Sequence, residues 1–469
     1  MPRVVPLLFL AAFSSAAQVV SGTIAGTVSD QAGAVVPAAK VVLVNQGTSF
    51  TREVTTNANG QYVASSIPTG EYAITAEQAG FQKLRRTGIR LTAADVLTVD
   101  LQLSVGSVQE TVEVTATAPL IQSQTAAVSS LVTNQQMVEM PLNGRTFTAL
   151  VLLSPGAYTG SSGNLTTSPY AMRGNANISV NGSSAQNNSY LIDGMVNRNL
   201  WLSTLIMVPT VDSIQEFRVL TSNYSAEYGV AAGAITVVQT KSGTNDFHGS
   251  AYEFFRNDKL DANTFFNNRA RIAKPAFRRN EFGGTFGGPI LRDKTFFFAD
   301  YQGIRIRQPR STVATIPALA QREMVRTGDF SALGAVIYDP QTTAAARTAF
   351  PGNRIPRERL DPAAVKLITL LPDPTSSGAT RNFVFNPTIE QRTDQFDVRV
   401  DQNIGTADRL FFKYSYDDTN LLTPGLLPMR PGSGISASSY LSADGASTGT
   451  QTPLRNQSGT LNYVRVFSP

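Results

Sequence analysis

The sequence contains no cysteine and a single histidine, His248, among its 469 residues. Without cysteine there is no disulfide, no zinc-thiolate site and no thiol nucleophile, and one histidine excludes every two-histidine metal site. Any histidine-assisted nucleophile would have to be built around His248 alone, so we predict a structural role for this residue. We therefore expect no catalytic residue, no bound metal and no cofactor.

Charged residues are also scarce, at 16% of the chain against about 25% in average soluble proteins. A net charge of +5 is too small for a concentrated nucleic-acid footprint, so no nucleic-acid partner is predicted. Beyond the N-terminus no apolar run reaches the roughly 18 residues of a membrane helix. If the chain lies in a membrane, it must do so as a β-barrel.

The first residues have the three-part layout of a secretory signal. One basic residue, Arg3, precedes an apolar run from Val4 to Phe13 and the small residues Ser14 to Ala17. This pattern predicts a signal peptide over residues 1–17 and an exported protein. The alternative, a buried core helix, is less favoured because an apolar run of this kind seldom serves that purpose at a bare N-terminus.

Residues 22–105 alternate short β-prone runs with turn residues, which predicts a small β-sandwich. The expected strands are Thr23–Val28, Lys40–Val44, Gln61–Ala64, Tyr72–Ala76 and Val96–Leu103.

This region resembles the carboxypeptidase-regulatory-like (starch-binding-like) domain. The resemblance rests on Gly26-Thr27-Val28-x-Asp30, Asn57-x-x-Gly60-x-Tyr62, Ile67-x-x-Gly70-x-Tyr72 and Gly80-Phe81. It implies a domain that binds sugar or protein. The alternative is a spacer whose glycine and aromatic residues only build turns and core, and we favour it because each matched position has such a role.

A β-prone segment, Gln109–Ala116, lies in the predicted linker 106–118. It could add itself as a strand to the sheet of a partner, or it could be the last strand of the sandwich.

Residues 119–247 are predicted to form a mixed α/β domain. Its turn and strand motifs include Asn143-Gly144-Arg145, Tyr190-Leu191-Ile192-Asp193-Gly194, Asp212-Ser213-Ile214-Gln215-Glu216-Phe217 and Gly233-Ala234-Ile235-Thr236-Val237-Val238. Their order resembles the plug domain of TonB-dependent outer-membrane receptors, and more narrowly the Oar-like group with its N-terminal regulatory-like sandwich. The resemblance implies a TonB box, the segment through which the TonB complex of the inner membrane pulls on the plug. Its candidate residues are Glu110, Thr111, Val112, Glu113 and Val114.

From His248 onward we predict the N-terminal part of an antiparallel transmembrane β-barrel, over residues 248–469. The expected strands are 248–257, 281–290, 295–304, 394–402, 408–417 and 457–467. Phe396, Val398 and Val400 alternate with polar residues, so one face suits lipid and the other a wet lumen. A soluble antiparallel sheet would alternate in the same way.

The connections between these strands distinguish a membrane barrel from a soluble sheet, because their lengths alternate: long, short, long, short, long. Tight periplasmic turns and extended external loops produce such an alternation in outer-membrane barrels. We therefore expect a protein of a Gram-negative outer membrane, with the sandwich and plug on the periplasmic side and the strands in contact with outer-membrane lipid. The basic clusters Arg269–Arg279 and Arg305–Arg310 then lie outside, where lipopolysaccharide could bind them, although ordinary solvated loop charge is the simpler interpretation.

Six strands cannot close a barrel in lipid, since two edges of unpaired backbone groups would remain. Receptors of this kind close with about 22 strands, so we expect the sequence to be an incomplete product or a fragment. The predicted fold is mainly β: a sandwich, a mixed α/β plug and the first barrel strands. The predicted function is TonB-dependent uptake of an unidentified oligosaccharide, peptide or siderophore, without catalysis. The alternative is an exported sandwich protein that binds carbohydrate or protein at the cell surface without transport.

Overall fold

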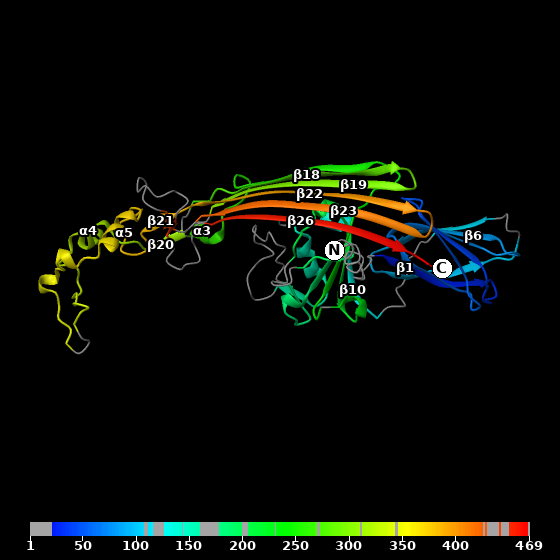
Figure 1. The fold of residues 1–469 in the computed structure, drawn as a ribbon, viewed down its shortest axis with the longest axis horizontal. Helices are drawn as coiled ribbons and strands as arrows, with labels where there is room; N and C mark the ends of the chain where they lie inside the picture. The colour runs from blue at the N-terminus through cyan, green and yellow to red at the C-terminus, as the bar shows by residue number, and fades with distance from the viewer. Residues whose placement is uncertain are drawn as a thin grey trace, which may run out of the picture.

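The computed structural model describes most of the chain after residue 20. The described residues are 21–106, 111–115, 126–142, 144–159, 178–198, 205–229, 231–269, 273–309, 312–342, 346–424, 427–428, 440–441 and 450–467. The predicted signal peptide, residues 1–17, lies outside them. Three β-rich bodies follow one another along the chain: a sandwich, a compact domain that we call the plug, and a sheet of long strands that we call the wall (Figure 1). No helix in the described ranges is long and apolar enough to cross a membrane.

The sandwich consists of two sheets, as the turn spacing predicts. One has the strand order β4-β1-β7, with β8 also paired to β1, and the other has the order β3-β2-β5-β6-β9. The strands are β1 (Gly22–Asp30), β2 (Lys40–Asn45), β3 (Thr51–Thr55), β4 (Gln61–Ile67), β5 (Gly70–Glu77), β6 (Lys83–Leu91), β7 (Val96–Thr98), β8 (Leu101–Leu103) and β9 (Thr111–Thr115). Apolar side chains from both sheets meet in one core, which includes Ile24, Leu43, Tyr62 and Tyr72.

Sequence reasoning missed two strands of the sandwich and merged two others. Strands β3 and β6 contain several charged or threonine residues, so neither presents an obvious apolar run. The predicted strand Val96–Leu103 is in fact two strands, β7 and β8. Between them the Val99 carbonyl accepts a hydrogen bond from the Tyr62 hydroxyl at 2.7 Å. A Cβ atom on Gly26 would lie only 2.0 Å from this same carbonyl oxygen, so glycine is required there.

The plug contains a five-stranded sheet with the order β10-β15-β16-β13-β14, and β11 and β12 form a separate pair. Its elements are β10 (Val128–Thr133), α2 (Asn134–Glu139), β11 (Ala157–Thr159), β12 (Ile178–Val180), β13 (Ser189–Ile192), β14 (Met195–Val196), β15 (Ile214–Ser222) and β16 (Ile235–Thr240), with 3₁₀ helices η2 (Phe147–Leu153), η3 (Ala185–Asn187), η4 (Val211–Ser213) and η5 (Ala226–Tyr228). Thr133 and Gln136 cap the start of α2 reciprocally, and Met137 points into the core beside Phe147 and Phe217.

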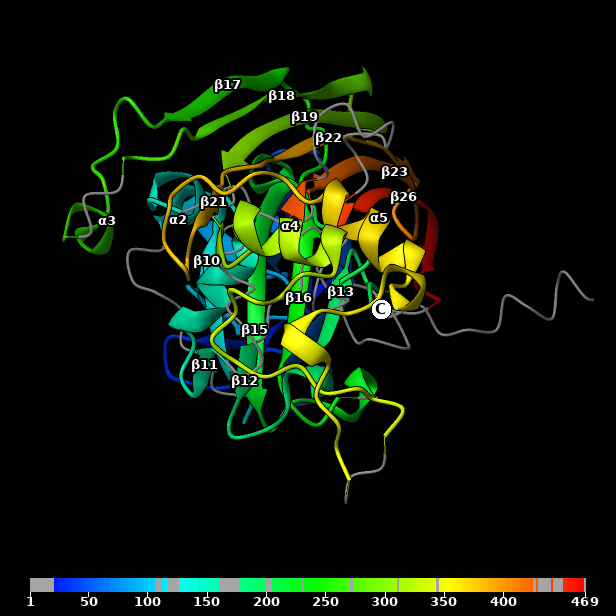
Figure 2. The same ribbon diagram turned by 90° about the vertical axis from the view of Figure 1, so that its left-hand side faces the viewer.

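The wall is an antiparallel sheet of six neighbouring strands in chain order. They are β17 (His248–Asn257), β18 (Arg278–Leu291), β19 (Thr295–Pro309), β22 (Thr388–Ile404), β23 (Asp408–Thr423) and β26 (Thr450–Arg465). The wall arches over the plug strands β10, β15, β16 and β13 (Figure 2). It is open in the described part of the chain, and the predicted mainly β fold is confirmed.

The wall strands are mostly longer than the sequence predicted. Strand β17 has the predicted bounds, whereas β18, β19, β22 and β23 extend beyond theirs and β26 begins seven residues earlier, at Thr450 instead of residue 457. Arg305 and Arg307, which were assigned to a loop, lie inside β19. Sequence reasoning ended each strand where its apolar residues ended, but main-chain pairing continues into the charged residues beyond.

Short and long connections alternate between the wall strands, as predicted. The short turns at 292–294 and 405–407 lie at the same end as the sandwich, and the long connections lie at the opposite end (Figure 1). The long connections carry α3 (Phe265–Arg269), β20 (Thr312–Ala314), α4 (Leu319–Thr327), η6 (Pro351–Asn353), η7 (Arg357–Arg359), α5 (Pro362–Leu370), β21 (Phe383–Phe385), β24 (Leu427–Pro428) and β25 (Tyr440–Leu441). We call the part from β20 to β21 the distal lobe.

Alternate side chains of the wall face the plug or point away from it. In β22, Arg399 and Asp401 are buried, whereas Phe396 and Val398 are exposed. The polar face that was predicted to line a wet lumen is thus covered by the plug, and the apolar face points outward.

Candidate functional site

The predicted TonB box lies at the edge of the sandwich. Glu110 is outside the described residues, whereas Thr111, Val112, Glu113 and Val114 belong to β9. Strand β9 pairs in parallel with β6, for example Val112 with Leu84, and it ends the sheet order in the described part of the chain. The segment therefore occupies the position of a last sandwich strand, with the side chains of Val112 and Glu113 exposed.

A buried cluster of charges joins the plug to the wall. Asp193 follows plug strand β13, and its carboxylate lies 3.1 Å from the Arg399 guanidinium of β22 and 3.3 Å from the Lys413 ammonium of β23. Arg399 also donates two hydrogen bonds of 2.8 Å to Asp401, and Lys413 lies 3.6 Å from Asp397. We call these five residues the Asp193 cluster.

The plug fixes the position of the Asp193 carboxylate. Thr240, at the end of β16, donates to it from its main-chain nitrogen at 2.9 Å and from its hydroxyl at 2.7 Å. Burial alone would raise the pKa of Asp193, but the charges of Lys413 and Arg399 and the two Thr240 bonds lower it below the ordinary aspartate value. Asp193 is therefore ionised, and its carboxylate lies between two cations of the wall, Arg399 and Lys413.

A second buried contact joins the plug to the sandwich. Glu216 of β15 accepts a hydrogen bond of 2.6 Å from the main-chain nitrogen of Ala93. Arg218, two residues later on the same face of β15, donates to the Ala93 carbonyl at 2.9 Å and to the Thr92 hydroxyl at 2.7 Å. The Arg218 guanidinium also lies 3.4 Å from the Asp95 carboxylate. We call these five residues the sandwich clamp.

Asn245 connects all three bodies where the plug leads into the wall. Its main-chain nitrogen donates to the Gly47 carbonyl of the sandwich at 2.9 Å. Its side chain bonds both the carboxylate and the main-chain nitrogen of Asp293, in the turn between β18 and β19, at 2.7 and 2.8 Å. The carboxylate accepts hydrogen bonds from Ser49 and Asn245, and these bonds lower the pKa of Asp293.

Arg145, from the motif Asn143-Gly144-Arg145, links the plug to the first wall strand. Its guanidinium pairs with Asp212 of the plug and lies over the rings of Tyr252 and Phe254, 5.0 and 3.9 Å from their centroids. A guanidinium between a carboxylate and aromatic faces is a favourable arrangement for both partners.

The described residues contain no group of three or more histidine or acidic residues arranged to bind a metal ion. A ring nitrogen of His248 lies 3.0 Å from the Asp246 carbonyl, at the sandwich end of β17. This position agrees with the structural role predicted for His248.

The two ends of the chain match separate protein families. Residues 239–469 match the model of an outer membrane beta barrel domain, and residues 23–104 match that of a carboxypeptidase regulatory-like domain. Over 303 residues the chain is 27% identical to the TonB-dependent transporter Oar of Myxococcus xanthus. The chain is related to the Oar-like TonB-dependent receptors. The resemblances drawn from the sequence motifs are thus confirmed, and the receptor is placed in the outer membrane of a Gram-negative bacterium.

The matched segment is 62% of this chain and 27% of its Oar relative, so the chain spans only part of that protein's length. Two solved structures are more distantly similar. The ferric enterobactin receptor of Pseudomonas aeruginosa aligns with 72% of this chain and 38% of its own, at 13% identity and a TM-score of 0.39. The siderophore receptor PirA of Acinetobacter baumannii aligns with 72% and 44%, at 15% identity and a TM-score of 0.33. These likenesses are too distant to indicate a ligand.

Sequence reasoning singled out several residues of the receptor's interfaces without pairing them. Asp193 and Glu216 lie in motifs that carried the plug resemblance, and Arg399 lies in an alternating wall strand. Arg218 and its partners in the sandwich were missed. One signal in the sequence could have indicated Arg218: it is a charged residue among the apolar residues of β15, and it lies on the same face of the strand as Glu216.

Proposed function

We propose that the full protein is a TonB-dependent transporter, with its sandwich and plug on the periplasmic side of the outer membrane. Its ligand would be an oligosaccharide, a peptide or a siderophore that reaches the plug from the side of the long connections. The observation that carries this proposal is the Asp193 cluster, which attaches the plug to the inner face of the wall by buried charges.

A buried ion pair makes such an attachment persistent. Removing one partner of a buried pair typically costs about 3–5 kcal/mol, because the other charge is left uncompensated away from water. Moving the plug past Arg399 and Lys413 therefore needs an input of energy. The TonB complex would supply this energy by pulling on Glu110–Val114. The position of β9 supports the assignment, because β9 ends its sheet in the described part of the chain and strand addition needs such an edge.

Transport of this kind makes and breaks no bond in the ligand. We propose accordingly that the receptor is not an enzyme. Its polar interfaces would serve attachment and release instead of catalysis, because the buried charges of the Asp193 cluster are paired with one another across two bodies.

Deleting Gln109–Ala116 from the full-length receptor should abolish its capture by the purified periplasmic domain of TonB. The expected loss arises because the strand that pairs with TonB is gone. Binding is measured by surface plasmon resonance with the receptor in detergent. A matched control replaces the same residues with an equal number of glycine and serine residues, which keeps the linker length and should also abolish capture.

Heat-modifiable mobility on gels checks that both variants still assemble their barrels. Undiminished capture of TonB by the deletion variant would contradict the assignment of Glu110–Val114. If the unaltered receptor did not bind TonB at all, the alternative of a surface protein that binds carbohydrate or protein without transport would be favoured.

A further inference from the structure

The outward face of the wall is ordered in rows, because the strand register sets one residue of each strand beside the next. Tyr301, Phe396 and Tyr416 form one row, and the rings of Phe396 and Tyr416 stack 5.3 Å apart. On the turn side of this row, the outward residues are mainly apolar and include Phe286, Phe297, Val398, Phe412 and Leu461. A lipid-facing band bordered by aromatic residues is typical of outer-membrane barrels. The aromatic row marks the boundary of that band away from the sandwich.

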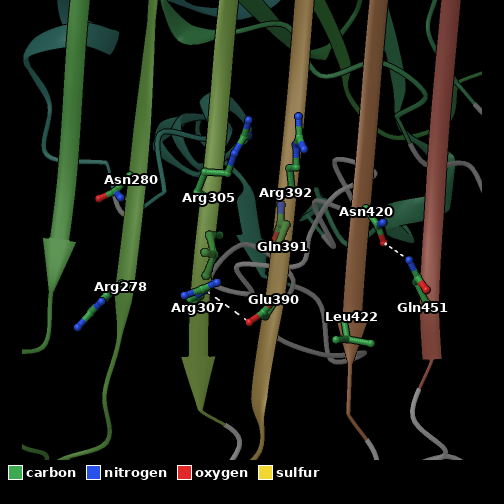
Figure 3. Close-up of a pocket in the computed structure, with 11 residues that line it drawn as sticks. Arg278, Asn280, Arg305, Arg307, Glu390, Gln391, Arg392, Asn420, Leu422 and Gln451 are labelled. Atoms are coloured by element: carbon green, nitrogen blue, oxygen red, sulfur yellow. Dashed lines mark hydrogen bonds and ion pairs between the residues drawn. The ribbon is translucent and has the colours of Figure 1, made fainter. Parts of the chain in front are cut away.

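Beyond this boundary the outward residues become polar and charged, and arginines outnumber carboxylates among them. We call the following group the outer basic patch: Arg278, Arg305, Arg307 and Arg392. Arg305 pairs in register with Arg392, and Arg307 lies between Arg278 and Glu390. Figure 3 shows these side chains on neighbouring strands, and they line a hollow of about 590 Å³.

Three of the four arginines contact two carboxylates. Asp394 accepts hydrogen bonds from Arg305 at 2.6 Å and from Arg392 at 2.9 Å, and Glu390 lies 3.5 Å from Arg307. Four positive and two negative charges leave the patch with an excess of two positive charges. The side chains of Arg307 and Arg392 remain 66% and 71% exposed, so both guanidinium groups can reach an external anion.

We propose that the outer basic patch binds the phosphate groups of lipopolysaccharide. The outer-membrane location follows from the barrel domain. The position of the patch at the outer leaflet rests on the orientation given in the proposed function. Planar guanidinium groups bind phosphate through paired hydrogen bonds. The acyl chains of the same lipid would lie against the apolar band directly below the patch.

The position of the patch distinguishes it from a site for the transported ligand. A ligand on its way through the barrel meets the inner face, where Glu281 of β18 pairs with Arg279. The patch lies on the opposite face of the same strand. The simpler interpretation, loop charge in solvent, applies poorly to Arg305, because its guanidinium is fixed by a hydrogen bond of 2.7 Å to the Thr393 carbonyl within the sheet. Fixed donors lose less freedom when an anion binds.

The test uses the double variant Arg307→Gln/Arg392→Gln of the full-length receptor. Native mass spectrometry measures its affinity for bisphosphorylated lipid A and for the dephosphorylated lipid. The variant should bind bisphosphorylated lipid A at least tenfold more weakly than the unaltered receptor, and both proteins should bind the dephosphorylated lipid equally. The matched control is Arg326→Gln/Arg357→Gln in the distal lobe, which removes the same charge and should leave both affinities unchanged.

Three results would overturn the proposal: equal affinity of the double variant and the unaltered receptor for bisphosphorylated lipid A, no preference of the unaltered receptor for the phosphorylated lipid, or an equal loss in the distal-lobe control. Displacement of lipid A by equimolar inorganic phosphate would also overturn it, since the site would then bind a free anion. Capture by the TonB domain is measured on the same variants. Its retention separates a failure of the lipid proposal from a failure of the transport proposal.

Discussion

Glu216 and Arg218 are neighbours in the sandwich clamp, but their substitution should have opposite consequences. Burial raises the pKa of Glu216 above the ordinary glutamate value of 4.5, although the Ala93 hydrogen bond and nearby arginines oppose this. The folded protein therefore binds a proton at Glu216 more readily than the unfolded chain does. The stability gained from this carboxyl is fully present below about pH 4.5 and is lost as pH rises through the folded pKa.

The variant Glu216→Gln should accordingly be as stable as the unaltered receptor at pH 7, or more stable, because the amide oxygen still accepts the Ala93 hydrogen bond without a buried charge. The difference should close as pH falls toward 4. Arg218→Met should instead destabilise the clamp by about 3–5 kcal/mol. Limited proteolysis of the sandwich in the full-length receptor, as a function of urea and pH, measures both effects. Equal destabilisation by the two variants at pH 7 would contradict this difference.

At the scale of elements, the parallel pairing of β9 with β6 limits how TonB can engage the receptor. If TonB takes β9 away from the sandwich, a disulfide between the strands should prevent binding. Arg85 and Glu113 are exposed register partners, and neighbouring strands lie within disulfide reach. The variant Arg85→Cys/Glu113→Cys should lose at least tenfold in affinity for the TonB domain when oxidised, and dithiothreitol should restore it.

The absence of cysteine from the chain makes the introduced pair its only thiols. A control disulfide between the exposed register partners Lys40 and Thr55, in β2 and β3, should leave TonB binding unchanged in either redox state. Unchanged binding by the oxidised β6–β9 variant would show instead that TonB adds to β9 in place.

The same elements show how far sequence reasoning reaches. Alternation predicted the faces of β22 and β23, because each side chain's direction in a strand depends only on its own position in the pleat. Strand ends were less predictable: Arg305 and Arg307 continue β19 since main-chain pairing does not require apolar residues. The pairing of Asp193 with Arg399 could not be predicted, because the two residues are 206 positions apart in sequence and their contact depends on how the plug and the wall meet.

Across the whole molecule, the sandwich clamp attaches the sandwich to an interior strand of the plug sheet and not to an edge strand. The sandwich clamp contacts β15, whose neighbours are β10 and β16. Among the described residues, β10 is the next strand after β9 along the chain, and it is an edge strand of the plug sheet. A pull on β9 therefore acts first on β10, while β15 stays attached to the sandwich through Arg218.

This order predicts that β10 is the first plug strand to leave when TonB pulls. Val132 of β10 is 6% exposed and Val219 of β15 is 0% exposed, so a cysteine at either position should be protected from a membrane-impermeant maleimide in the resting receptor. In energised cells with an intact TonB complex, Val132→Cys should become labelled at least several-fold faster than Val219→Cys. Cells that lack TonB should label neither position. Faster labelling of Val219→Cys, or labelling of Val132→Cys without TonB, would show that the plug opens by another route than the peeling of its edge strand.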